Sequence, residues 1–164
     1  MRLLEILTES LIDRAKHVAI AAHGHQMYGK YPYSYHLTDV VNRVKTITQD
    51  PEIIAAAWLH DTVEDTDITI ENISSEFGEN IANMVWAVTG TGSNRKEKMA
   101  DAIAKIARTP GSEMIKSADR LSNASASAVN NPTLLKMYKD EHKDLSPVLG
   151  NNALAMALLK LFSN

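Results

Sequence analysis

The chain has 164 residues, of which 45% are hydrophobic and 23% charged, so we expect one folded domain over residues 1–164 and exclude a disordered chain. It contains no cysteine, which excludes disulfides and thiolate metal sites, so a transition-metal site must use histidine and carboxylate, and a reducing cytoplasm is the simplest location. The net charge of -3 gives no general basic field for nucleic acid, and no apolar run approaches the ~20 residues of a membrane span, so we expect a soluble protein.

The first third of the chain predicts two helices joined by an aromatic loop. Apolar residues recur at helical spacing from residue 3 to about residue 22, which indicates a long amphipathic first helix. Residues 23–35 break this pattern with two glycines and a proline, and they hold four of the five tyrosines, a composition typical of a ligand-binding loop. A second helical segment follows, and His36 stands at its start.

Start and stop signals divide the rest of the chain into further helices. Asp50 and Pro51 offer an N-cap acceptor followed by proline and start the helical segment at residues 53–59, Thr69 opens a helix that Gly78 ends, and one asparagine of residues 151–152 caps a final apolar helix. The other predicted helices cover residues 81–88, 95–108, 112–128 and 134–145. With about eight helices and no alternating strand pattern, the predicted fold class is all-α. The tryptophans of the apolar runs, Trp58 and Trp86, are expected in the core.

The most informative stretch is residues 55–66, where an apolar helix runs into a group of polar and ionisable side chains. His60 and Asp61, left unpaired at the end of a buried helix, would cost several kcal/mol, and a bound metal ion would remove that cost. Glu64 lies four residues after His60 and three after Asp61, so it returns to the same side if the helix or a tight turn continues. This is the position of a carboxylate that lies just outside the metal ligands.

Candidate metal ligands stand at three separated places: His36, the His-Asp doublet just described, and Asp119 on a polar stripe of a later helix. Two imidazoles and two carboxylates suit a divalent ion such as Mn, Fe, Zn or Co, and octahedral coordination leaves two positions for water and substrate. Such an ion polarises a phosphoryl oxygen and lowers the pKa of bound water, which Glu64 and Asp65 could orient or deprotonate. Hydrolysis of a phosphate ester is the reaction that this set fits best.

Three motifs resemble the HD phosphohydrolase superfamily, and more narrowly the hydrolase domain of the RelA/SpoT homologues and their single-domain small alarmone hydrolases. Residues 60–66 read His-Asp-Thr-Val-Glu-Asp-Thr and match the block that distinguishes this branch from other HD proteins. Residues 32–36 resemble its Pro-Tyr-x-x-His segment, and residues 116–123 resemble the helix that supplies the last aspartate. The match covers nearly the whole chain with its spacing preserved.

The resemblance implies a compact HD-domain helical fold and a manganese-dependent enzyme that removes the 3′-diphosphate from guanosine 3′-diphosphate 5′-di- or triphosphate, the alarmone of the stringent response. Nothing in the chain resembles the synthetase domain of that family, so only degradation is implied, and the oligomeric state is left open. The resemblance assigns the metal ligands His36, His60, Asp61 and Asp119, the catalytic carboxylates Glu64 and Asp65, and the substrate contacts Lys96, Asn123 and Tyr138.

The chain departs from the family pattern at Tyr28, where these enzymes usually carry an arginine against the base. A tyrosine can stack on a purine, so Tyr28 is a candidate substrate contact, but a neutral ring in place of a cation leaves guanine versus adenine preference open. Ser122 replaces the usual histidine of its helix without removing a ligand. Two alternatives follow: a phosphohydrolase that acts on another nucleotide, such as an adenosine alarmone or a phosphorylated dinucleotide, and a module that binds alarmone without cleaving it. The intact ligand set argues against the second.

Overall fold

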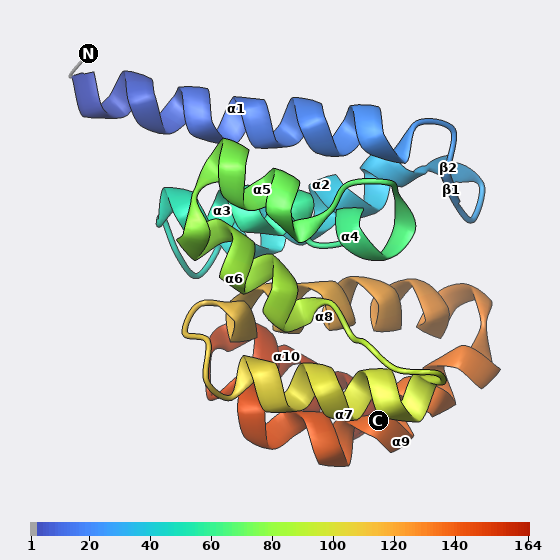
Figure 1. Ribbon diagram of the computed structural model, residues 1–164. Coiled ribbons are helices and arrows are strands. Elements are labelled where there is room, and N and C mark those ends of the chain that lie inside the picture. Colours follow the sequence, from blue (N-terminus) through green and yellow to red (C-terminus); the bar gives the residue numbers. More distant parts are fainter. Residues whose placement is uncertain (1–2) are drawn as a thin grey trace.

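The computed structural model describes residues 3–164, which form ten helices and one antiparallel pair of two-residue strands (Figure 1). The predicted all-α class is confirmed. No helix within these residues combines the length and the apolar character needed to cross a bilayer. The elements are α1 (Leu3–His23), β1 (Met27–Tyr28), β2 (Tyr31–Pro32), α2 (Tyr33–Lys45), α3 (Pro51–Leu59), α4 (Thr62–Asp65), α5 (Ile70–Phe77), α6 (Glu79–Val88), α7 (Arg95–Ile106), α8 (Ser112–Asn130), α9 (Pro132–Leu149) and α10 (Ala153–Phe162).

The helix starts follow their capping residues. Asp50 Oδ1 accepts a hydrogen bond of 2.9 Å from the Glu52 N–H at the start of α3. Thr69 and Asn72 form a capping box at the start of α5, and the Asn152 side chain caps α10. Each cap satisfies N–H groups that the first helical turn leaves unpaired and contributes roughly 1 kcal/mol. The three helix starts predicted from these caps are confirmed.

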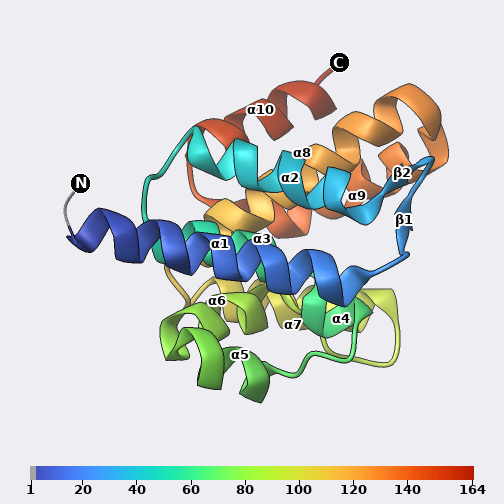
Figure 2. The same ribbon diagram turned by 90° about the horizontal axis from the view of Figure 1, so that it is seen from above.

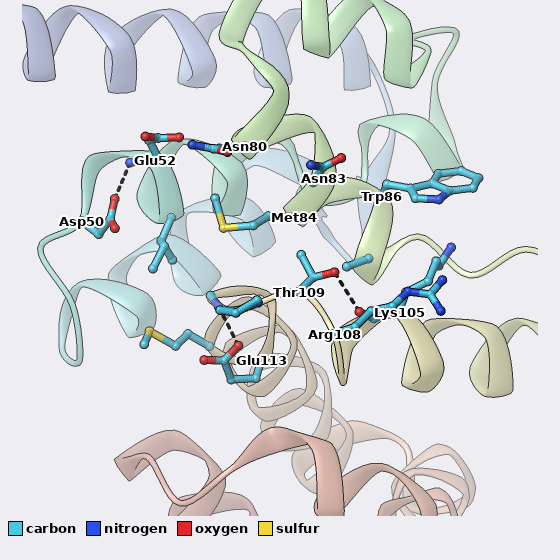
Figure 3. A pocket seen from close by; sticks show the side chains of 15 residues that line it. Asp50, Glu52, Asn80, Asn83, Met84, Trp86, Lys105, Arg108, Thr109 and Glu113 are labelled. Carbon is cyan, nitrogen blue, oxygen red and sulfur yellow. Dashed lines mark hydrogen bonds between the residues drawn. The ribbon is translucent and has the colours of Figure 1, made fainter.

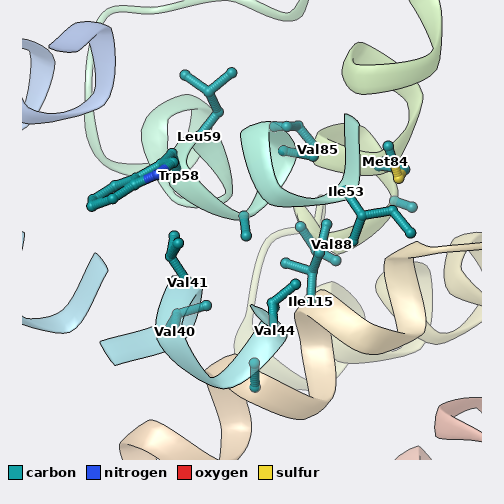
Figure 4. Packing of buried hydrophobic residues seen from close by; sticks show 14 of the residues in the cluster. Val40, Val41, Val44, Ile53, Trp58, Leu59, Met84, Val85, Val88 and Ile115 are labelled. Carbon is teal, nitrogen blue, oxygen red and sulfur yellow. The ribbon is translucent and has the colours of Figure 1, made fainter. Parts of the chain in front are cut away.

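Helix α3 lies at the centre of the molecule. It packs against α1, α2, α6 and α8, and residues 53–59 are all buried. A helix that is apolar on every side is stable only when other elements surround it, and Figure 4 shows side chains of α2, α6 and α8 converging on α3. Trp58 is 4% exposed, as predicted. The prediction for Trp86 is wrong, since this residue is 39% exposed on the outer side of α6.

Two layers of helices meet across α6 and α8. Helices α1 to α5 lie together on one side, and α7, α9 and α10 lie on the other (Figures 1 and 2). Helix α8 packs against α2 of the first layer and against α9 and α10 of the second. Because α2 and α8 are side by side, His36 on α2 comes close to Asp119 on α8.

The aromatic segment between α1 and α2 contains a short hairpin that the sequence pattern does not predict. Met27 pairs with Pro32 and Tyr28 pairs with Tyr31 across the two strands. Gly29 takes φ +59° at the first position of the turn, where glycine avoids the clash that a Cβ atom would cause. Strands of two residues are too short to produce a recognisable alternation of polar and apolar residues.

Candidate active site

Two histidines and two aspartates converge between the layers. His36 comes from the first turn of α2, Asp119 from the middle of α8, and His60 and Asp61 from the turn that joins α3 to α4. One ligand atom of each residue lies within 4.8 Å of those of the other three. His36 Nε2 is 3.2 Å from Asp119 Oδ1, and His60 Nε2 is 3.0 Å from Asp61 Oδ2. The structure therefore brings together the four residues predicted as metal ligands.

The turn after α3 explains how two neighbouring residues reach the same point. Helix α3 ends at Leu59, and Asp61 has φ -103° and ψ 0°, values of the bridge region between helix and strand. The Thr62 hydroxyl donates a hydrogen bond of 2.8 Å to the Leu59 carbonyl and holds this turn closed. The one-turn helix α4 then carries Glu64 to the cavity that Asp61 lines.

Hydrogen bonds fix both imidazole rings with Nε2 toward the carboxylates. His60 Nδ1 lies 2.7 Å from the Ala57 carbonyl, which can only accept, so Nδ1 carries the proton of the neutral ring and Nε2 carries a lone pair. His36 Nδ1 lies 3.1 Å from Ser122 Oγ. His60 Nε2 is buried and makes no hydrogen bond within residues 3–164, although Asp61 is near. A buried lone pair beside two carboxylates fits a divalent cation.

The charges of the cluster set its protonation. Burial by itself lowers the pKa of both imidazoles, but the carboxylates of Asp61 and Asp119 outweigh this effect and raise the pKa of His36 and His60. Burial by itself raises the pKa of both carboxyls, but His60, His36 and, for Asp119, also Lys116 hold it well below the usual range. Protons on the imidazoles thus balance the carboxylates, and a cation at the same point would balance them in the protons' place.

The cluster opens into a cavity of about 480 Å³ that both predicted catalytic carboxylates line. Glu64 Oε1 accepts a hydrogen bond of 2.9 Å from the Gly90 N–H. Asp65 Oδ2 accepts one of 3.1 Å from the Gln26 side-chain amide. Partial burial raises the pKa of Glu64, although the Gly90 N–H acts in the opposite direction. A raised pKa suits a carboxylate that takes a proton near neutral pH.

Four cationic side chains also line this cavity. Glu141 holds two of them, since its oxygens lie 2.5 Å from Arg95 Nε and 2.6 Å from Arg120 Nη1. Both guanidinium groups also lie over the Tyr138 ring, at 5.8 and 4.6 Å from its centre. Planar cations held in this way suit phosphate oxygens. The cationic residues of the wall are Arg95, Lys98, Lys116 and Arg120.

The predicted substrate contact Lys96 does not line the cavity. Helix α7 presents residues 95, 98, 99 and 102 to it, which is the spacing of one helical face. Each residue of a helix is rotated by about 100° from the one before, so the side chain of Lys96 points away from Arg95. Lys96 belongs to a cationic run, residues 95–98, and the structure places Arg95 and Lys98 of this run on the cavity wall instead.

The remaining predicted contacts lie where this cavity meets a second hollow of about 800 Å³. The Tyr28 ring stacks on His36 with centroids 4.6 Å apart, and its hydroxyl donates a hydrogen bond of 2.8 Å to Asn123 Oδ1. The Asn123 amide in turn donates to Asp119 Oδ1 at 2.9 Å. Tyr138 and Asn123 line both spaces, whereas Tyr28 lines only the second. The hollow also contains Lys30, Tyr31, Tyr35 and Leu134.

A helical fold in which two histidines and two aspartates meet around one point defines a metal-binding α-helical domain. The chain belongs to the HD-domain family, whose model, described as HD domain, matches residues 15–152.

Known proteins similar to this chain carry related names. A guanosine-3′,5′-bis(diphosphate) 3′-pyrophosphohydrolase of Aquifex aeolicus is 38% identical over 118 residues, which cover 68% of this chain and 17% of that protein. The pyrophosphohydrolase MESH1 of Drosophila melanogaster is 34% identical over 106 residues, 62% of this chain and 59% of that protein. The solved structure of a metazoan ortholog of SpoT, reported to hydrolyse ppGpp, has a TM-score of 0.82 at 28% identity and covers 93% of this chain and 94% of its own.

Proposed function

We propose that this protein is a metal-dependent hydrolase that removes the 3′-diphosphate from guanosine 3′-diphosphate 5′-di- or triphosphate. The observation that carries the proposal is the His₂Asp₂ cluster, with its ligand atoms within 4.8 Å, at the base of a cavity lined by two further carboxylates and four cations. The activity in the names of the relatives supports it. The chain spans only 17% of the length of the first relative. We further propose that residues 1–164 form a single domain and that the protein is cytoplasmic.

His36, His60, Asp61 and Asp119 would hold one divalent ion, and the resemblance to the RelA/SpoT hydrolases favours Mn²⁺. The donor set fits, because each imidazole turns a ring nitrogen toward the point where the carboxylates meet. When bound, the ion supplies polarisation of a phosphoryl oxygen and a lower pKa for water.

Different residues of the cavity would activate the water and bind the substrate. Glu64, with its raised pKa, would take the proton of the attacking water, and Asp65 would orient that water. Arg95 and Arg120 would hold the diphosphate, because their guanidinium groups stay paired with Glu141 and ready to donate. The hollow that shares Asn123 with the cavity would receive the nucleoside.

The test uses purified protein loaded with Mn²⁺ and incubated with guanosine 3′-diphosphate 5′-diphosphate. We expect release of diphosphate, lost on chelation and in the variant His60→Ala. The matched control is His17→Ala, which removes an exposed histidine of α1 and should keep full activity. Turnover that survives both chelation and His60→Ala would refute the proposed mechanism.

A second candidate, favoured by Tyr28, is the same reaction on another nucleotide, such as an adenosine 3′,5′-bis(diphosphate). Tyr28 lines the hollow proposed for the nucleoside and stacks on His36. Its neutral ring stands where the RelA/SpoT hydrolases usually carry an arginine, so the preference for guanine can differ. Parallel assays with the guanosine and adenosine compounds separate the two candidates by their kcat/KM values. A protein inert on every nucleotide but binding the guanosine compound would instead be a binding module.

A further inference from the structure

One peptide group connects Glu64 to a buried lysine on the far side of the active-site wall. The carbonyl of Thr89 accepts a hydrogen bond of 2.5 Å from Lys105 Nζ, and the N–H of Gly90 donates one of 2.9 Å to Glu64 Oε1. These two groups are the C=O and N–H ends of the same planar peptide unit. A cation on its oxygen therefore polarises the N–H that holds the Glu64 carboxylate.

Lys105 is buried, and its ammonium group has partners besides the Thr89 carbonyl. It is 4% exposed, its ammonium lies 2.6 Å from Asp101 Oδ2, and it sits 4.0 Å from the centre of the Trp86 ring. Asp101 Oδ2 also accepts hydrogen bonds from the N–H and the hydroxyl of Thr91, at 3.0 and 2.9 Å. Side chains of α7 thus hold the residues on both sides of Gly90, and the Gly90 N–H points toward Glu64.

Gly90 packs directly against the backbone of α7 at Lys98. A Cβ atom at Gly90 would lie 2.5 Å from the carbonyl oxygen of Lys98, so only glycine fits. Together with the two anchors at Thr89 and Thr91, this contact fixes the direction of the Gly90 N–H.

Lys105 does not reach the substrate cavity. It lines a separate cavity of about 750 Å³, between the start of α3, α6 and the turn before α8, where Figure 3 shows it near Trp86. The residues that line this 750 Å³ cavity include none of the His₂Asp₂ cluster and neither catalytic carboxylate. The direct connection from Lys105 to the active site is therefore its hydrogen bond to the peptide that also holds Glu64.

We propose that Lys105 is a positioning residue for Glu64, acting through the Thr89–Gly90 peptide group with Asp101 as the second anchor. The inference rests on the proposed function for the role of Glu64, but the hydrogen-bonded link itself needs neither metal nor substrate. It predicts that loss of the Lys105 ammonium lowers kcat and leaves KM nearly unchanged, since no cavity contact is lost.

The first measurement is the Gly90 amide proton resonance of the full-length, metal-free protein. A bond to a carboxylate from a polarised peptide shifts this resonance downfield, so we expect an upfield move both in Lys105→Met and in Glu64→Gln. The control Lys136→Met removes an exposed lysine paired with Asp140 on α9 and should leave the resonance in place. A Gly90 resonance unchanged in Lys105→Met would overturn the proposal.

The second measurement is kinetic and uses the Mn²⁺-loaded protein with the guanosine compound. We expect Lys105→Met to lower kcat by on the order of 10- to 100-fold, the size of effect for residues that orient ligand groups from behind. In a Glu64→Gln background the same change should cost less than about twofold, because the link has nothing left to position. An equal loss in both backgrounds would mean a general structural role and would contradict the inference.

If Lys105→Met does not fold, Asp101→Ala tests the same link from a residue that lies one-third exposed. It should give the same upfield move at Gly90 and the same loss of kcat at unchanged KM, and an unshifted resonance would count against the link. A wild-type protein that is inactive on the guanosine compound, with Gly90 still shifted in both variants, would refute the proposed function and leave the link standing.

Discussion

The Tyr33 hydroxyl donates a hydrogen bond of 2.7 Å to Asp61 Oδ2, the oxygen that also lies 3.0 Å from His60 Nε2. Tyr33 comes from the first turn of α2, three residues before His36, and its ring stacks on His23 with centroids 4.5 Å apart. One side chain therefore ties the orientation of a carboxylate in the α3–α4 turn to the helix that supplies a histidine ligand.

Tyr33→Phe should keep this ring packing and lose only the bond to Asp61. We expect metal affinity to fall about 10- to 100-fold, because a ligating carboxylate depends on its hydrogen-bond partner for orientation. Calorimetric titration with Mn²⁺ measures the change. Tyr35→Phe, which alters an exposed ring stacked on Tyr31, is the matched control and should bind normally. Equal affinities in both variants would show that Tyr33 does not orient Asp61.

Metal affinity should rise with pH. The pKa of His36 and His60 is raised, so near and above the ordinary histidine value of about 6.5 both rings still hold protons that a cation must displace. Loss of two protons corresponds to about a hundredfold gain in affinity per pH unit until the rings are neutral. Titrations with Mn²⁺ at several pH values from about 6 to about 9, a range that includes the ordinary histidine pKa, test this expectation. A pH-independent affinity would mean that the rings are already neutral in the free protein.

The metal-free protein should show the opposite trend in stability. A raised folded-state pKa contributes stability that is fully present below about 6.5 and is lost as the pH rises through the raised value. We therefore expect the Tm of the metal-free protein to fall over this range, and the fall to be smaller in His60→Ala. Thermal unfolding followed by circular dichroism with chelator present provides the measurement. A steeper fall in the variant would contradict the assignment.

Arg120→Met should weaken substrate binding more than turnover. Arg120 is 3% exposed, and its guanidinium contacts Glu141 and lies over the Tyr138 ring on the cavity wall. Loss of one charge-assisted contact of roughly 1.5–3 kcal/mol predicts a KM increase of at least about tenfold. Steady-state kinetics give KM and kcat separately. The control Arg108→Met lies in the other cavity and should keep the wild-type KM.

Tyr28→Phe should raise KM by about fivefold without changing metal affinity. The ring can remain stacked on His36, whereas Asn123 loses the hydroxyl that holds its amide, a bond worth about 1 kcal/mol. Kinetics with the guanosine compound and a parallel Mn²⁺ titration separate the two effects. A large loss of metal affinity instead would place Tyr28 in support of His36 and not of the nucleotide. Lys136→Met, which removes an exposed lysine of α9 outside both spaces, is the control and should keep the wild-type KM.

Much of the fold could be predicted from local signals. Asp50, Thr69 and Asn152 mark helix starts because a cap needs only its own side chain and the next few N–H groups. The hairpin at Gly29 and the exposure of Trp86 could not, since two-residue strands leave no pattern and the face of α6 that meets the core depends on distant helices.

The candidate site divides in the same way. The cluster around His60 could be predicted because its spacing is carried by a motif, and the structure places those four residues together. The resemblance to the family points to Lys96, but a run of cations does not tell which helical face meets the cavity, and the face that lines it carries Arg95 and Lys98. The link from Lys105 to Glu64 could not be predicted, since it runs through a backbone carbonyl in a loop, and backbone groups are the same in every sequence.

His36 lies on α2 of the first layer and Asp119 on α8, which joins the two layers, and this position has one more consequence. An ion gripped by both would close the long stretch of chain between them into a ring, and cross-links over long stretches restrict the unfolded ensemble most. Folding and metal binding would then be thermodynamically linked, so the ion would stabilise the fold as well as take part in the reaction.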